Sequence, residues 1–402
     1  MLNKKLLNIC FVSQEYPPET GWGGIGSYVY EMARALNEKG HRVIVLARAV
    51  EKESYTFTEG IYVYRILPRW NLGKIRFFWR FQKIINGYRY AVAGKLDELV
   101  KKHNIDIIES SEIYADILYY QLTRKRRPAI AIKLHTPRWL VDKIAGNKPE
   151  LWNRLEYLAE WVTIKKADSA YSCSRALLTT AEKYLPKRKY SAVYNPINLP
   201  NKMLVREDDG RTILFVGRLE WHKGVQVFRT VIPKVLNKKA DVNFAFLGPD
   251  SSWHGGHSLK DYILKQIPEE MKNSVHFLGG VPREKVFEYL QKASMCVLPS
   301  LWENFPYTCL EAMSCGCVVV GSRNGGMAEM IEDGTSGILI DPEKPEEISG
   351  AILKLLSDKN LCQQMGQNAA VRVREMFSTD KIVEQTLEVY RQAIEIHGQK
   401  KA

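Results

Sequence analysis

The chain has 402 residues, of which 45% are hydrophobic and 26% charged, a composition typical of soluble globular proteins. Its length exceeds what one core ordinarily needs and predicts two domains of roughly 150–200 residues each. No stretch reaches the roughly 20 uninterrupted apolar residues of a membrane-spanning helix. Seven cysteines, an odd number without pairing or ligand spacing, argue against a disulfide framework and favour a reducing, cytoplasmic location.

The net charge of +13 is spread unevenly along the chain. Residues 1–200 hold 33 Lys and Arg against 19 Asp and Glu, a balance of +14, whereas residues 201–402 hold 25 against 26, a balance of −1. This asymmetry predicts an anionic partner for the first half, such as a membrane surface, an anionic saccharide or nucleic acid. Because no recognisable nucleic-acid-binding module accompanies the charge, nucleic acid is the least expected of the three.

The first half alternates short apolar runs with amphipathic stretches. Residues 6–13 (LLNICFVS) are expected to form a buried first strand, because a signal peptide would need a small-residue cleavage site that they lack. A helix should follow over 27–40, with one apolar face and Gly40 at its end. Further strands are expected at 41–48, 105–110, 129–135 and 169–174. This order predicts parallel strands covered by helices.

The segment 65–90 departs from this pattern because it interleaves basic and aromatic residues. Within it, Arg76, Trp79 and Arg80 are candidate contacts to a membrane surface or an acceptor, since such helices place rings at the headgroups and cations on anionic lipid. An ordinary helix with its rings turned inward is an equally good interpretation. The run Arg124–Arg127 is expected to be a solvated turn.

The alternation restarts after a linker at 194–202. Strands are expected at 211–219, 241–248, 274–280, 295–300 and 317–322, with a helix at 225–236 and a long closing helix from 379. We therefore expect two Rossmann-like domains, an N-terminal one over 1–198 and a C-terminal one over 199–378. The closing segment 379–402 is expected to pack back on the first domain.

The glycine-rich loop 21–28 (GWGGIGSY) lies between the first strand and its helix, where glycines allow close approach of a ligand and a helix N-terminus favours phosphate. Its spacing is not that of a dinucleotide fingerprint, and the next strand ends on Arg48 rather than on an acid. A dinucleotide-dependent dehydrogenase is therefore disfavoured.

Two pairs of charged residues follow expected strands of the second half. Arg218 and Lys223 lie in VGRLEWHKG and could converge on one anionic group. Glu303 follows a strand end, and Glu311 lies eight residues later, about two turns into a helix with Pro306 in its first turn. Ligands in open α/β sheets bind at these carboxyl ends, so these residues are candidates for a sugar and ribose site.

With Gly23-Gly24, the VGRLxxxKG pattern and ENFPYTCLE, the sequence resembles the retaining glycosyltransferases of family 4 over nearly its whole length. The resemblance implies an α/β GT-B fold of two Rossmann-like domains facing a cleft. It implies that the N-terminal domain (1–198) binds the acceptor and that the C-terminal domain (199–378) binds the nucleotide-sugar. It also implies sugar transfer from a nucleotide donor to an acceptor with retained anomeric configuration, no metal ion and no cofactor beyond the nucleotide-sugar substrate. At the domain junction the sequence has Asn195-Pro196-Ile197-Asn198 where the family often has N-G-[VI]-D, which leaves the details of the hinge open.

The resemblance implies a role for each matching residue. Arg218 and Lys223 would bind the donor diphosphate and stabilise it as it leaves, and Glu303 would bind hydroxyls of the transferred sugar. Glu311 would bind the ribose, and Gly24 would let its loop close over the phosphates. His135, in AIKLHTPRW, matches a histidine near the sugar and acceptor. The full donor set expected is Gly23, Gly24, Arg218, Lys223, Glu303, Asn304, Phe305, Pro306, Tyr307 and Glu311.

Two other functions remain open at this stage. A nucleotide-sugar epimerase would use the same diphosphate and ribose contacts but needs acid and base groups at the sugar ring, which the sequence does not offer. A non-catalytic protein that docks on membranes would have no need of Arg218, Lys223, Glu303 and Glu311 together. The expected enzyme moves a hexose from a UDP-sugar, or else from GDP-mannose, to a glycan or lipid-linked acceptor in surface polysaccharide synthesis. It is expected to be cytoplasmic, on the inner face of the cell membrane.

Overall fold

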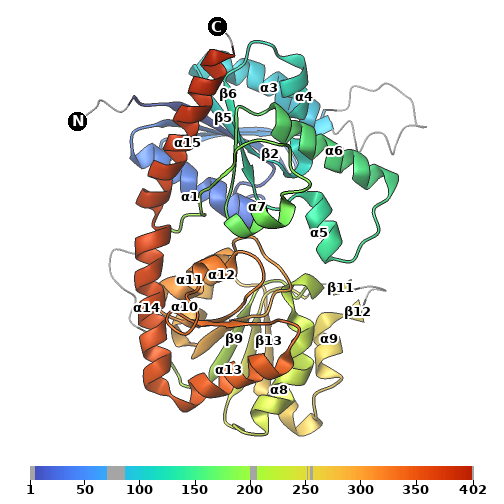
Figure 1. Ribbon diagram of the computed structural model, residues 1–402, viewed down its shortest axis with the longest axis vertical. Helices are drawn as coiled ribbons and strands as arrows, with labels where there is room; N and C mark the ends of the chain where they lie inside the picture. Colours follow the sequence, from blue (N-terminus) through green and yellow to red (C-terminus); the bar gives the residue numbers. More distant parts are fainter. Residues whose placement is uncertain (1–4, 70–86, 200–205, 251, 254–256, 401–402) are drawn as a thin grey trace. The chain divides into compact units, whose positions relative to one another are not determined.

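The computed structural model describes the chain except residues 1–4, 70–86, 200–205, 251, 254–256 and 401–402. The chain divides into two compact units, each built on a mainly parallel sheet with helices (Figure 1). Unit 1 comprises Met1–Pro196 and Thr379–Ala402, and unit 2 comprises Ile197–Ser378. The division thus falls between residues 196 and 197, where the sequence placed it after 198.

The unit 1 sheet has eight strands in the order β3-β4-β2-β1-β5-β6-β7-β8, all parallel except β3. Strand β2 shows why the chain forms such a sheet, because its apolar run is buried on both faces and only its end residues are exposed. The strands are β1 (Asn8–Ser13), β2 (Arg42–Arg48), β3 (Ser54–Thr58), β4 (Ile61–Ile66), β5 (Ile107–Ser111), β6 (Ala129–Leu134), β7 (Ser169–Ser172) and β8 (Ser191–Ala192).

The hairpin β3–β4 is absent from the sequence-based prediction and changes the interpretation of Arg65. That residue belongs to β4 and is 4% exposed. Its guanidinium donates to the carbonyl of Tyr16 at 3.0 Å and pairs with Glu19 at 2.8 Å. Arg65 is therefore a buried structural cation rather than the start of a basic surface segment.

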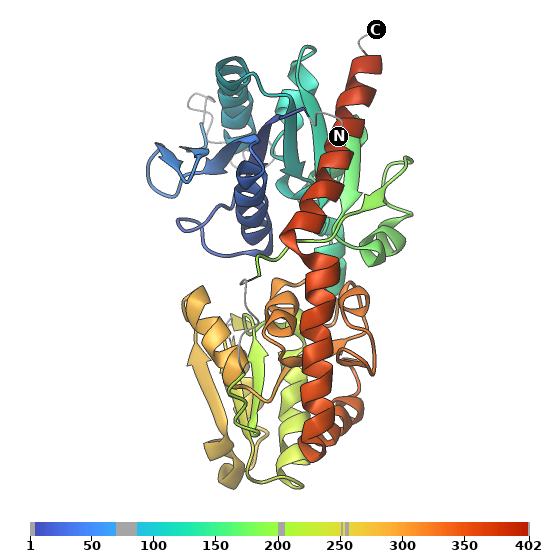
Figure 2. The same ribbon diagram turned by 90° about the vertical axis from the view of Figure 1, so that its left-hand side faces the viewer.

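Helix α1 of unit 1 buries the apolar face that its periodicity predicts. In α1, the residues Val29, Met32, Ala33 and Leu36 are all buried. Helix α15 contacts α1, β6 and β7, while α3, α4 and α6 contact one another in series (Figures 1 and 2). The helices are α1 (Gly24–Glu38), α3 (Gly87–His103), α4 (Leu118–Thr123), α5 (Arg138–Ile144), α6 (Leu151–Lys166), α7 (Arg175–Ala181) and α15 (Thr379–Gln399).

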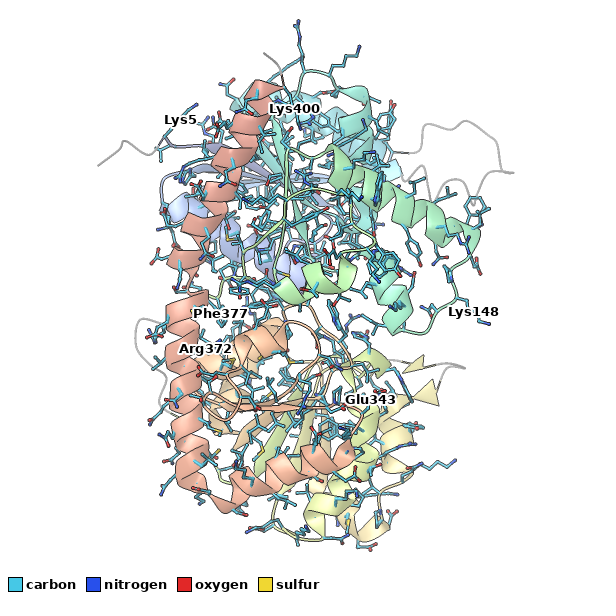
Figure 3. All side chains as sticks on the ribbon, in the orientation of Figure 1. Lys5, Lys148, Glu343, Arg372, Phe377 and Lys400 are labelled. Carbon is cyan, nitrogen blue, oxygen red and sulfur yellow. The ribbon has the colours of Figure 1, made fainter. Side chains whose placement is uncertain are left out.

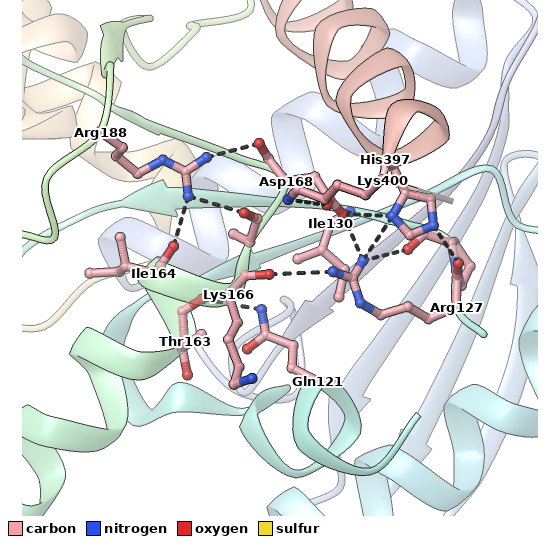
Figure 4. A network of polar contacts seen from close by, with 12 residues as sticks. Gln121, Arg127, Ile130, Thr163, Ile164, Lys166, Asp168, Arg188, His397 and Lys400 are labelled. Atoms are coloured by element: carbon pink, nitrogen blue, oxygen red, sulfur yellow. Dashed lines mark hydrogen bonds and ion pairs between the residues drawn. The ribbon is translucent and has the colours of Figure 1, made fainter. Parts of the chain in front are cut away.

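Two polar clusters attach α15 to the sheet. In the first, Tyr390 of α15 and Tyr171 of β7 both donate to the buried carboxylate of Glu109 on β5. In the second, the fully buried carboxylate of Asp168 pairs with Arg127 at 2.6 Å and with Lys400 at 3.0 Å (Figure 4). The expectation that the whole 124–127 run is a solvated turn is wrong for Arg127, whose side chain is 12% exposed because it meets Asp168.

Replacing Asp168 with Asn should test this attachment. The change leaves Arg127 and Lys400 without their carboxylate, so the free energy of unfolding should fall by about 3–5 kcal/mol in urea titrations. The matched control is Asp380→Asn, which breaks the pair with Lys39 at a 90% exposed carboxylate and should cost at most about 1 kcal/mol. Equal losses in the two variants would contradict this account.

The unit 2 sheet has six parallel strands in the order β13-β10-β9-β14-β15-β16. Phe215, Phe228 and Phe246 pack edge to face or tilted in its core, between the sheet and α8. The strands are β9 (Thr212–Val216), β10 (Asn243–Leu247), β13 (Val275–Gly279), β14 (Met295–Leu298), β15 (Val318–Ser322) and β16 (Ile338–Ile340), with a separate pair β11 (Ser252–Trp253) and β12 (His257–Ser258). The helices are α8 (Phe228–Leu236), α9 (Leu259–Leu264), α10 (Arg283–Lys292), α11 (Tyr307–Ser314), α12 (Met327–Met330), α13 (Pro345–Ser357) and α14 (Lys359–Phe377).

Helix α14 ends at Phe377, and Ser378 forms a bridge with Ile197, so the two ends of unit 2 lie side by side. Among the described residues, no helix is both long enough and apolar enough to cross a bilayer.

Candidate active site

The loop after β9 lies against the loop after β14 through their backbones. The 3₁₀ turn Trp221–Lys223 ends on Gly224, which has a φ of +74°. A Cβ at Gly224 would lie 1.7 Å from the carbonyl oxygen of Pro299, so only glycine permits this approach. The amide of Leu301 donates to the carbonyl of His222 at 2.9 Å, which joins the two loops side by side.

This approach brings together the two most important predicted side chains. The ammonium of Lys223 lies 2.7 Å from Oε2 of Glu303, and the hydroxyl of Ser300 donates to the other carboxylate oxygen. Burial raises the pKa of the Glu303 carboxyl, but the Lys223 charge and the two hydrogen bonds outweigh it, so that pKa lies below its ordinary value. The Glu303 carboxyl is therefore ionised at neutral pH, and the pair is mostly shielded, with 22% of the Lys223 side chain and 14% of the Glu303 side chain exposed.

The loop after β15 fixes the backbone of Glu303. The amide of Gly326 donates to the Glu303 carbonyl at 2.8 Å, and Asn324 donates to the carbonyl of Leu301. Gly325 has a φ of +78°, and a Cβ there would lie 2.1 Å from the Glu303 carbonyl oxygen. The sequence pattern did not predict this support for Glu303. The only signal of it was the Gly325-Gly326 pair, which lies shortly after the strand expected at 317–322.

The other predicted cation of this loop has a separate partner. Arg218 pairs with Glu220 at 2.8 Å, and its side chain is 64% exposed. Glu220 also lies 3.3 Å from the imidazole of His222, whose pKa is lowered by burial and by the neighbouring Lys223. Arg218 and Lys223 thus follow the same strand end, as predicted, but each is paired with a different carboxylate.

The segment 304–307 leads into α11, which begins at Tyr307 with Pro306 as its N-cap. The first turn of α11 directs backbone N–H groups toward this end of the helix. Asn304 is buried, and Phe305 packs edge to face against Phe377 at 5.4 Å. The Phe305 side chain therefore anchors the loop in the core of unit 2. Only the backbone of Phe305 is left to contact a ligand.

Glu311 lies one turn into α11 rather than the predicted two, because the helix begins at Tyr307. Its carboxylate accepts a hydrogen bond from Nε of Arg283 at 3.0 Å, and both side chains are mostly buried. Arg283 begins α10, and nothing in the sequence pattern pointed to it.

The glycine-rich loop of unit 1 has a close carboxylate neighbour. Gly23 is the N-cap of α1, and the amide of Gly26 donates to Oε2 of Glu15 at 3.1 Å. A Cβ at Gly23 would lie 2.1 Å from that same oxygen, whereas no described atom lies within 4 Å of the position at Gly24. Gly23 therefore makes room for Glu15, and Gly24 faces open space that a ligand could enter.

His135 directly follows β6 and is fixed by its backbone and its ring. Its amide donates to both oxygens of Glu112, at 2.9 and 2.8 Å, and its ring packs edge to face against Tyr28 of α1 at 5.3 Å. Burial, together with the nearby Lys133 charge, lowers the pKa of His135 to about 3. The imidazole is therefore neutral at physiological pH and does not supply a positive charge to the site.

The remaining predicted site residues, Arg76, Trp79 and Arg80, lie outside the described residues. Within the part of the chain that the structure describes, no group of three or more His, Cys, Asp or Glu side chains could hold a metal ion.

Comparison with known proteins assigns both halves of the chain to one kind of enzyme. Residues 22–200 match the family described as Glycosyltransferase Family 4, and residues 201–372 match the family described as Glycosyl transferases group 1. The chain is a family 4 glycosyltransferase. Its fold is the GT-B fold of two Rossmann-like α/β domains, as the sequence predicted.

Relatives of this glycosyltransferase cover almost its full length. An uncharacterised glycosyltransferase of Methanocaldococcus jannaschii is 26% identical over 98% of this chain and 100% of its own. The N-acetyl-alpha-D-glucosaminyl L-malate synthase of Bacillus anthracis is 24% identical over 93% and 94%. Among solved structures, sucrose-phosphate synthase from Thermosynechococcus elongatus has a TM-score of 0.77 at 19% identity, covering 96% of this chain and 98% of its own. Anabaena HepE in complex with UDP has a TM-score of 0.68 at 18% identity, over 95% and 99%.

Gly325→Ala should test whether the loop after β15 positions Glu303 in this glycosyltransferase. The added Cβ must displace the Glu303 backbone, so kcat/KM for donor turnover should fall about tenfold or more. Gly334→Ala is the matched control, because Gly334 also has a positive φ (+75°) but no described atom within 4 Å of the Cβ position. Equal kinetics in the two variants would rule out this positioning role.

Arg283→Gln should separate binding from chemistry. If Arg283 orients Glu311 for the donor ribose, Arg283→Gln should raise the donor KM several-fold and alter kcat less. Arg283→Lys keeps a positive charge and should restore part of the affinity for the donor. Arg323→Gln, which breaks a more exposed pair with Glu347, is the control and should leave KM unchanged. An unchanged KM in Arg283→Gln would disprove the assignment.

Proposed function

We propose that this glycosyltransferase is a retaining, metal-independent hexosyltransferase that uses a nucleotide-sugar donor. The observation that carries the proposal is the Lys223–Glu303 ion pair at the carboxyl ends of β9 and β14. A cation and a carboxylate in contact suit the two parts of such a donor, because diphosphate needs positive charge and sugar hydroxyls need an acceptor.

The proposed roles follow from charge. Breaking the bond between sugar and diphosphate builds positive charge on the sugar and negative charge on the leaving group. Lys223, Arg218 and the first-turn amides of α11 would stabilise the leaving diphosphate, a contribution of several kcal/mol for such preorganised donors. Glu303 would bind hydroxyls of the transferred sugar, and Glu311, held by Arg283, would bind the ribose.

In the proposed reaction the acceptor hydroxyl attacks the anomeric carbon from the face that the diphosphate leaves. Its proton passes to an oxygen of the departing phosphate, so the products are the glycoside and the nucleoside diphosphate. This route needs no base on the protein, which is consistent with His135, because an imidazole whose pKa is lowered to about 3 accepts a proton only weakly.

For the donor we favour a UDP-hexose over GDP-mannose, and Anabaena HepE, a structural neighbour solved with UDP-glucose, supports that order. We place the acceptor among glycans or lipid-linked saccharides of surface polysaccharide synthesis, at the cytoplasmic face of the membrane, because the basic charge lies in the first half of the chain. An epimerase and a non-catalytic membrane-docking protein are the alternatives that the experiment must exclude.

A donor panel scored for nucleotide release, with and without lipid-linked acceptors, tests the proposal. UDP-hexose should support acceptor-dependent release that EDTA does not reduce, and Lys223→Ala and Glu303→Ala should each lower the rate by about 100-fold with unchanged circular dichroism. Lys238→Ala, at an exposed cation of unit 2, is the control. Wild-type rates in both site variants would refute the assignment, a sugar isomer formed without nucleotide release would indicate an epimerase, and no turnover of any donor would favour a binding protein.

A further inference from the structure

Helix α6 carries apolar residues on its exposed side. Leu151, Arg154, Leu158, Trp161 and Lys165 follow one another at intervals of three, four, three and four residues, so they form one stripe along about 21 Å of helix. Leu151 is 67% exposed and Leu158 is 54% exposed. Large apolar side chains that alternate with cations on the outside of a helix are typical of a surface that meets another phase or partner.

The charges around this stripe are almost entirely positive. Between residues 138 and 166, Lys143, Lys148, Arg154, Lys165 and Lys166 are exposed, and no ion pair involves them among the described residues. Figure 3 shows the Lys148 side chain pointing away from the unit. Glu150 is the one exposed carboxylate in this range, since Asp142 and Glu160 are buried and Glu156 pairs with Arg89.

The fold holds this surface in place through Asp142 of α5. Its buried carboxylate accepts hydrogen bonds from Asn153 and Tyr157 of α6, at 3.2 and 2.8 Å, and from Asn147 of the connecting loop at 3.3 Å. Helices α5 and α6 are in contact, and in Figure 1 they lie on the side of unit 1 away from α15. The exposed stripe is therefore part of an ordered helix pair that needs no refolding to present it.

We infer that this α5–α6 face, defined as Val141, Leu151, Leu158 and Trp161 with Lys143, Lys148, Arg154, Lys165 and Lys166, docks on the surface of an anionic lipid bilayer. The leucines would enter the boundary between headgroups and acyl chains, and the cations would contact lipid phosphates. The aromatic ring of Trp161, already 4.7 Å from the Lys165 ammonium, suits the headgroup level.

Other occupants fit the surface less well. A second copy of the chain would bring these unpaired cations against one another around a twofold axis, which costs energy. RNA or a soluble anionic saccharide would account for the cations but would leave the exposed leucines without a function. The bilayer satisfies both halves of the pattern.

This inference gives the membrane association in the proposed function a definite surface, and it can be tested without any donor. The full chain should co-sediment with vesicles of phosphatidylglycerol and phosphatidylcholine, less so in high salt, and not with phosphatidylcholine alone. Arg154→Glu with Leu158→Glu should weaken binding by at least about tenfold. Lys354→Glu with Val371→Glu, on exposed positions of unit 2, makes the same change in charge and should bind as wild type does. Thermal unfolding of each variant confirms that it is folded.

Two further variants separate the alternatives. Leu151→Ser with Leu158→Ser removes apolar area without changing charge and should also weaken vesicle binding. If it binds vesicles fully while the charge reversal does not, the contact is electrostatic alone and the proposed entry of the leucines into the bilayer is overturned. Arg76→Glu with Arg80→Glu tests the segment outside the described residues, and loss of binding there but not at Arg154 and Leu158 would equally overturn it. Donor turnover that persists in every one of these outcomes would leave the proposed function intact.

Discussion

The close contact between the backbones of Gly224 and Pro299 determines which side chains meet at the candidate site. The turn that carries Lys223 touches the β14 loop at Pro299, and this is possible because Gly224 has no side chain. From that contact follow the pairing of Lys223 with Glu303, the hydrogen bond of Ser300 and the lowered pKa of the carboxyl. A side chain at residue 224 would push the two loops apart and separate Lys223 from Glu303. Each charge would then be partly buried without its partner, which is strongly unfavourable. The glycine and the ion pair therefore depend on each other.

Around this contact, each cation of the proposed site already has a carboxylate. Arg218 pairs with Glu220, Lys223 with Glu303 and Arg283 with Glu311. In the proposed function, binding a diphosphate would therefore exchange partners instead of neutralising isolated charges, and the gain would be the difference between two sets of contacts. The ion pairs hold these side chains in place without a ligand. The pairing would also link sugar recognition to phosphate recognition, because moving Lys223 toward a phosphate would free an oxygen of Glu303 for a hydroxyl.

Periodicity and strand-end position were sufficient to predict the parallel sheets, the buried face of α1 and the place of Glu303 after a strand, because these depend on local pattern. The partners could not be predicted in this way. Arg283 lies 28 residues before Glu311, and Arg127 meets Lys400 only through Asp168, so these contacts arise from tertiary packing alone. The hairpin β3–β4 was missed because its exposed strand lacks the apolar run that marks the others. Glu15 at the start of α1 shows the same limit, since the glycines predicted an anion site but not that the chain supplies its own carboxylate.

Because α15 belongs to unit 1, the two units cannot finish folding in the order in which they begin in the chain. Unit 2 is one continuous stretch, Ile197–Ser378, inserted between two parts of unit 1. A ribosome therefore synthesises all of unit 2 before it makes Tyr390, His397 and Lys400, which close the polar clusters at Glu109 and Asp168. Until then Glu109 has Tyr171 but lacks Tyr390, and Asp168 has Arg127 but lacks His397 and Lys400. The first half of the enzyme to be synthesised is thus the last to be finished, because its fold includes α15, which follows unit 2 in the chain.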